Sequence, residues 1–124
     1  MKRLTAFEQF EYYVHTLNNL GLFLRECDTN EIEYRVFEEF DSDCVSFLHE
    51  NTLNALLRAG LITSEIFELS LELAQRFRRL ENTPYRNAPS VQTEDAWAEL
   101  LALADKIKAM LNVEQRISAE DTKT

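Results

Sequence analysis

Glycine and proline, the residues that most often interrupt regular structure, each occur only twice in this chain of 124 residues. With so few turn-forming residues, the regular elements have to be long. Apolar residues recur at spacings of three and four, and no stretch alternates with the period of two that a half-buried strand requires. We therefore predict an all-α protein, with residues 1–112 forming one domain, an irregular bundle of five to six helices. Residues 113–124 are polar, and we expect a frayed tail.

Residues that favour helix starts divide the chain into these helices. A first helix of about 18 residues and a second that ends near Phe40 precede a third, which can break near residues 49–51. Gly60 provides a left-handed helix stop, and residues 82–92, which contain both prolines, are predicted to form a loop. The expected caps, in chain order, are Thr5 with Glu8, Asp28, Asp43, Asn51, Thr63 and Thr93.

The apolar spacing also predicts which side chains are buried. Tyr12 and Asn19 are expected on the exposed side of the first helix. The buried stripe of that helix is expected to be Phe7, Phe10, Val14, Leu17 and Leu24. In the later helices the expected apolar positions include Val45, Leu48, Leu53, Leu56, Ile66, Leu73, Phe77, Leu80, Trp97, Leu100 and Ile107.

The charge of the chain is concentrated in one region. The net charge is −9, and residues 26–50 hold nine carboxylates against Arg35 alone, a local charge of −8. Residues 76–86, in contrast, hold four arginines and one glutamate. Direct binding to nucleic acid is disfavoured, because phosphate contacts need a larger basic surface than this arginine cluster offers.

The residue patterns of known catalytic, metal and cofactor sites are missing from the sequence. Neither His15 nor His49 belongs to the Glu-x-x-His pairs of di-iron bundles, and there is no His-x-x-x-His, Cys-x-x-Cys or phosphate-binding loop. Cys27 and Cys44 have no metal or redox spacing, so we expect two free thiols. We expect no enzymatic activity, no metal and no cofactor, although a catalytic or ligand-binding bundle stays open as an alternative.

The sequence also predicts where the protein resides. The first ten residues carry two basic side chains, but a glutamate interrupts the apolar run that a signal peptide would need. No apolar stretch approaches the roughly 20 residues required to cross a bilayer. We expect a cytoplasmic protein that does not contact membranes.

The acidic region has the character of a surface that binds a basic partner. The apolar residues of the second helix share one face by i, i+4 spacing, so Tyr34, Glu38 and Asp41 should point away from the core. A tyrosine among carboxylates suits an interface anchor, although such a charge run can also be a solvated face that keeps a protein soluble. The predicted partner-binding residues are Glu31, Tyr34, Glu38, Asp41, Asp43 and Glu50.

A resemblance to a known class of proteins is carried by residues 47–81, FLHENTLNALLRAGLITSEIFELSLELAQRFRRLE, and by residues 97–111, WAELLALADKIKAML. The matching features are the phrase TLNALLRAGLITSEI, the arginine-rich helix end, the loop and the last helix with tryptophan at its head. These segments resemble small all-helical immunity proteins of bacterial polymorphic toxin systems, in particular those of contact-dependent growth inhibition.

The resemblance implies a cytoplasmic inhibitor that binds the basic C-terminal domain of its cognate toxin, in a 1:1 complex. Toxins of this kind are often nucleases, and among nuclease types we favour an EndoU-like RNase. The alternative is a DNA-mimicking inhibitor or regulatory adaptor, such as an anti-restriction or anti-CRISPR protein.

Overall fold

The first helix, α1 (Ala6–Asn18), begins where the sequence predicts. The Thr5 hydroxyl accepts a hydrogen bond from the Glu8 amide, and the Glu8 carboxylate accepts one from the Thr5 amide, at 3.1 and 3.0 Å. The helix has 13 residues rather than about 18, and a turn of 3₁₀-helix, η1 (Leu22–Glu26), follows it. The chain turns at Gly21, where a Cβ atom would lie 2.7 Å from a carboxylate oxygen of Asp105.

A single long helix of three segments follows, here called the 29–47 helix. It consists of α2 (Thr29–Ile32), a π-helix, η2 (Glu33–Phe40), and α3 (Asp41–Phe47). Asp28 caps its start as predicted, by accepting a hydrogen bond from the Glu31 amide at 2.8 Å. The predicted end near Phe40 and the predicted cap at Asp43 are wrong, because the helix continues through both positions.

The π-helix has a cause in the sequence. The buried residues of this region repeat strictly every four positions: Ile32, Val36, Phe40, Cys44 and Leu48. Around an α-helix of 3.6 residues per turn, a four-residue repeat drifts by about 40° at each step. The wider turns of the π-helix correct this drift, and the repeat therefore stays on the face that packs against the core.

The next two helices are α4 (Glu50–Arg58) and α5 (Ser64–Glu81). The predicted break at residues 49–51 is present, but His49 rather than Asn51 is the cap, since its Nδ1 atom accepts a hydrogen bond from the Asn51 amide at 3.1 Å. Gly60 has the predicted left-handed conformation, with φ of 76°. Thr63 caps α5 as predicted.

The last two helices are α6 (Ala88–Thr93) and α7 (Asp95–Asp121). The predicted loop at residues 82–92 is therefore helical in part, because Asn87 accepts a hydrogen bond from the Ser90 amide and caps α6. Thr93 is the final residue of α6, where its hydroxyl donates to the Pro89 carbonyl, so it does not cap α7 as predicted.

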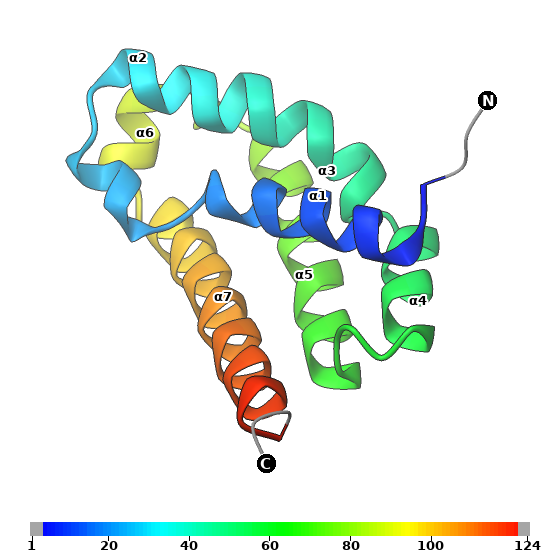
Figure 1. Ribbon diagram of the computed structural model, residues 1–124. Coiled ribbons are helices and arrows are strands. Elements are labelled where there is room, and N and C mark those ends of the chain that lie inside the picture. The colour runs from blue at the N-terminus through cyan, green and yellow to red at the C-terminus, as the bar shows by residue number, and fades with distance from the viewer. Residues whose placement is uncertain (1–3, 122–124) are drawn as a thin grey trace.

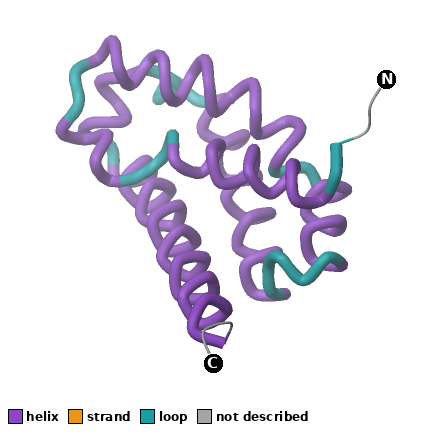
Figure 2. Tube along the Cα trace, viewed as in Figure 1, coloured by secondary structure: helices purple, strands orange, loops and turns teal. Residues whose placement is uncertain are grey.

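The computed structural model describes residues 4–121, with side chains as far as Asn112. The predicted tail at residues 113–124 lies outside the described side chains, although α7 itself runs to Asp121. Between residues 4 and 121 the chain has no strand (Figure 2). Its six helices, with the 29–47 helix counted as one and the short 3₁₀ turn η1 left out, form one domain, which confirms the predicted all-α fold. No helix in this range combines the length and the apolar character needed to cross a membrane.

The helices are arranged as a pair lying across a second pair (Figure 1). α5 and α7 run antiparallel and pack against each other, and α1 and the 29–47 helix lie side by side across them. α4 packs beside α5, and α6 fills the end of the bundle between η1 and α7. The 29–47 helix forms the upper edge of the molecule in this view.

An aromatic cluster joins these layers. The ring of Phe77 on α5 lies edge-on to Phe40 and to Trp97, with centroid separations of 4.8 and 6.1 Å. The Trp97 indole donates a hydrogen bond to the Tyr85 carbonyl at 2.8 Å. Trp97 thus anchors both the start of α7 and the loop after α5. Most predicted core positions are buried, including those of the last helix.

Three burial predictions are wrong. Phe7 is 68% exposed and Val45 is 54% exposed, whereas Asn19 is buried. The inner face of α1 is formed by Tyr13, Thr16 and Leu17, and the buried Leu20 follows just after the end of the helix. The Tyr13 hydroxyl forms a buried hydrogen bond with the Ser70 hydroxyl at 2.6 Å, which allows this polar aromatic residue to take the central position on α1.

Candidate partner-binding surface

The 29–47 helix presents a tyrosine among carboxylates on its exposed side. Tyr34 is 54% exposed, and Glu31 and Glu38, three residues before it and four after it, are exposed as well. We call these three residues the Tyr34 face. Because residues three and four apart lie on the same side of a helix, the three side chains form one stripe. Tyr34 and Glu38 point outward as predicted.

The hydroxyl of Tyr34 lies in a negative electrostatic environment. The charge of Glu39 is the largest cause of a raised Tyr34 pKa, and Glu38 adds to it, whereas Arg35 acts in the opposite direction. Tyr34 therefore remains a neutral hydrogen-bond donor at physiological pH. An exposed phenol with carboxylates around it is suited to contact a cationic partner.

The one basic residue in this region neutralises only part of the charge. The Nε atom of Arg35 donates to a Glu31 carboxylate oxygen at 3.0 Å, and the guanidinium also lies 5.4 Å from the ring centre of Phe23. Among residues 4–112, no ion pair involves Glu33 or Glu38. Glu38, on the Tyr34 face, is thus available to a cation from outside the chain.

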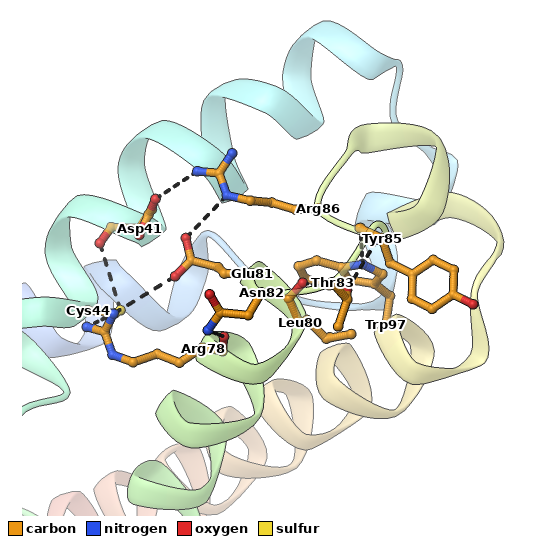
Figure 3. Close-up of polar contacts among 10 residues, drawn as sticks. All are labelled: Asp41, Cys44, Arg78, Leu80, Glu81, Asn82, Thr83, Tyr85, Arg86 and Trp97. Carbon is orange, nitrogen blue, oxygen red and sulfur yellow. Dashed lines mark hydrogen bonds and ion pairs between the residues drawn. The ribbon is translucent and has the colours of Figure 1, made fainter.

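Asp41 does not belong to the Tyr34 face. Its carboxylate pairs with Arg86, at 3.2 Å, and the same guanidinium lies 3.5 Å from Glu81 at the end of α5 (Figure 3). Burial and the neighbouring Asp41 raise the pKa of Glu81. Arg86 also lies 5.2 Å from the ring centre of Phe37, so the loop after α5 covers the part of the acidic region around Phe37 and Asp41.

Asp43 and Glu50 are also separated from the Tyr34 face. Asp43 is half-buried and lies close to Glu39 and to His15 of α1. Burial and the charge of Glu39 raise the Asp43 pKa, and the charge of His15 lowers it. Glu50 lies beyond the helix break, exposed in the first turn of α4. Of the six predicted residues, the structure brings together Glu31, Tyr34 and Glu38.

Glu39 and His15 are site residues that the sequence prediction missed. On an ideal α-helix, Glu39 is about 140° away from Tyr34, five residues earlier, so helical spacing places the two apart. The π-helix hydrogen bonds each residue to the fifth one along, which brings such pairs closer. The sequence feature that could have indicated the π-helix is the four-residue repeat of apolar residues in this region. No local pattern links His15, on another helix, to this region.

The two cysteine thiols, Cys27 and Cys44, offer little reactivity in the folded state. Cys44 is buried on the inner side of the 29–47 helix, with its Sγ atom 3.8 Å from the Asp41 carbonyl and 4.0 Å from an Arg78 nitrogen (Figure 3). Burial raises the Cys44 pKa to about 11, despite the opposing charge of Arg78. Burial and the charge of Glu31 also raise the pKa of Cys27. Both thiols are therefore weak nucleophiles at neutral pH.

Comparison of the chain with known protein families, with characterised proteins and with solved structures finds no match. No relative therefore assigns a role to the Tyr34 face, and its function has to be inferred from its charge and geometry.

Proposed function

We propose that this protein is an inhibitor that binds a basic protein domain through the Tyr34 face. Its partner would be a toxin of the nuclease class, and the protein would be the cognate immunity protein, acting in the cytoplasm where such a toxin cleaves its substrate. The observation that supports this proposal most directly is the exposed Tyr34 beside Glu38, a carboxylate without an ion pair among residues 4–112.

The physical basis is charge complementarity. A nuclease attracts phosphate groups with lysine and arginine side chains, and the same side chains attract a carboxylate-bearing helix. Such attraction increases association rates by about 10–10³-fold, an advantage for an inhibitor that has to act before cleavage. Once the complex forms, Tyr34 supplies the large, partly apolar anchor that dominates many interfaces.

The DNA-mimic alternative is less favoured by the arrangement of the carboxylates. A mimic needs negative charges spaced along its surface as phosphates are along a duplex. Asp41 is instead paired with Arg86, and Asp43 is placed beside α1, so the acidic surface is short. A short acidic surface fits a local cleft of a protein partner better than it fits an extended DNA-binding surface.

The first test is to identify the partner. The tagged protein is used as bait in a lysate of its source cells expressing the native locus, at low and at high salt. Salt-sensitive recovery of one exported protein with a basic C-terminal domain is the expected result. Recovery of a restriction or CRISPR nuclease would instead favour the mimic. Bound cofactor and activity in the purified protein would favour the enzyme alternative.

The second test measures binding to that partner and inhibition of its activity. Tyr34→Ala is expected to weaken binding by at least tenfold, about 1.4 kcal/mol, mainly through faster dissociation. Glu38→Gln is expected mainly to slow association, with a smaller effect at high salt. Tyr85→Ala is the matched control, since Tyr85 is a similarly exposed tyrosine at 43% on the loop after α5. Unchanged affinity in the triple variant Tyr34→Ala, Glu31→Gln, Glu38→Gln would exclude this surface.

A further inference from the structure

Three potential metal ligands meet where α1 runs along the 29–47 helix. His15 comes from α1, Glu39 from the π-helix η2 and Asp43 from α3. The Nε2 atom of His15 lies 3.9 Å from a Glu39 carboxylate oxygen. One ligand atom from each of the three residues lies within 4.8 Å of those of the other two.

The two carboxylates of this cluster lie close together, and neither is paired with a lysine or arginine among residues 4–112. Glu39 and Asp43 are four residues apart, the spacing at which helices place two metal ligands on one face. Like charges at this spacing repel each other. Among residues 4–112, no lysine or arginine pairs with either carboxylate, and the only ion-pairing partner is His15.

We propose that His15, Glu39 and Asp43 bind one divalent transition-metal ion, for which Zn²⁺ is the best fit. One imidazole nitrogen and two carboxylate oxygens form a donor set that suits Zn²⁺, whereas Mg²⁺ and Ca²⁺ prefer oxygen donors alone. The ion would remove the repulsion between the carboxylates and link α1 to the 29–47 helix. A water molecule would complete a four-coordinate site.

The required adjustment of the ligands is small. Bonds of about 2.0–2.2 Å in a tetrahedral site place ligand atoms about 3.3 Å apart, so the three atoms have to move closer together by at most about 1.5 Å. His15 is exposed, and Glu39 and Asp43 are only half-buried. Their side chains can therefore rotate toward an ion without any change in the core.

The sequence does not reveal this site, because His15 comes from a helix that is distant in sequence from the two carboxylates. His15 and Glu39 are separated by 24 positions, and η1 and α2 lie between them. Helix packing alone brings the imidazole next to the carboxylates. The proposal does not require a toxin partner, although Glu39 also lies close enough to Tyr34 to raise its pKa.

Calorimetric titration of the tag-free protein with ZnCl₂, in a non-coordinating buffer at neutral pH, tests the site. We expect one Zn²⁺ per chain and no binding of Mg²⁺ or Ca²⁺. His15→Gln, Glu39→Gln and Asp43→Asn should each weaken Zn²⁺ binding by at least about tenfold. His49→Gln and Glu33→Gln, which make the same chemical changes outside the cluster, should bind Zn²⁺ as the original protein does.

Two further measurements separate ligation from altered folding. The imidazole proton resonances of His15, and not those of His49, should shift when Zn²⁺ is added. The midpoint of thermal unfolding should rise with Zn²⁺ in the original protein and stay constant in His15→Gln. Equal Zn²⁺ affinity in His15→Gln, or the absence of both binding heat and a His15 shift in the original protein, would overturn the proposal.

Discussion

Arg86 forms an ion pair with Asp41 at 3.2 Å, across a separation of 45 residues in the sequence. The loop after α5, which carries Arg86, therefore lies against the interior of the 29–47 helix and not at its end (Figure 3). The two regions of opposite charge are in contact, and the acidic surface left exposed is shorter than the sequence suggests. This contact centres the exposed charge on the Tyr34 face.

Replacing Arg86 with glutamine should lower the free energy of unfolding by about 1 kcal/mol. Part of this loss comes from the ion pairs with Asp41 and Glu81, which are weak because they are partly solvent-exposed. The rest comes from the contact between the guanidinium and the Phe37 ring, which is of comparable strength. Urea denaturation measures the change. Arg79→Gln is the matched control, because Arg79 forms no ion pair among residues 4–112. Equal effects of the two substitutions would show that the Arg86 contacts do not stabilise the fold.

The buried hydrogen bond between Tyr13 and Ser70 should produce strong coupling in a double-mutant cycle. Tyr13→Phe leaves the Ser70 hydroxyl buried without its hydrogen-bond partner. Ser70→Ala likewise leaves the Tyr13 hydroxyl buried without a partner. Each single change should lower the free energy of unfolding by about 1–2 kcal/mol. The double variant should lose little more than either single variant. Additive losses in urea denaturation would argue against the bond.

Stability should fall at alkaline pH. Burial raises the pKa of Cys44 to about 11 and that of Tyr13 to about 12, so the folded protein holds these protons when the unfolded chain has released them. The stabilisation is present in full below the pKa values of the unfolded chain and is lost as the pH rises through the folded values. The free energy of unfolding should therefore decrease from about pH 9 upward, by at most about 1.4 kcal/mol per pH unit for each group.

Urea denaturation between pH 8 and pH 11 measures this decrease. Tyr13→Phe, which lacks one of the two groups, should show a smaller decrease above pH 10 than the original protein. A free energy of unfolding that stays constant up to pH 11 would show that neither proton is retained by folding.

Substitution of Gly60 should separate backbone strain from steric hindrance. A Cβ atom at Gly60 would meet no atom within 4 Å, but the φ of 76° is unfavourable for residues other than glycine and, to a lesser extent, asparagine. We expect Gly60→Ala to lower the free energy of unfolding by about 1 kcal/mol and Gly60→Asn to lower it by less. Thermal or urea denaturation distinguishes them. Equal stability of the original protein and Gly60→Ala would mean that the turn relaxes.

The sequence by itself determined three of the six predicted helix caps and the helix stop at Gly60. Thr5, Asp28 and Thr63 cap helices as predicted, and Gly60 ends α4 as predicted. These features depend on contacts between residues two to four positions apart, which any helical conformation of the chain brings together. The Tyr34 face was predictable for the same reason, since its three residues share one side of one helix.

Tertiary structure alone decided which of the remaining carboxylates in residues 26–50 are available to a partner. Asp41 pairs with Arg86 from a distant loop, and Asp43 and Glu39 meet His15 from another helix. Likewise, Tyr13 rather than Phe7 is buried on α1, because Ser70 on α5 supplies a partner for its hydroxyl. Helical periodicity defines the direction of a side chain relative to its own axis, but the neighbour that it meets depends on how the helices pack.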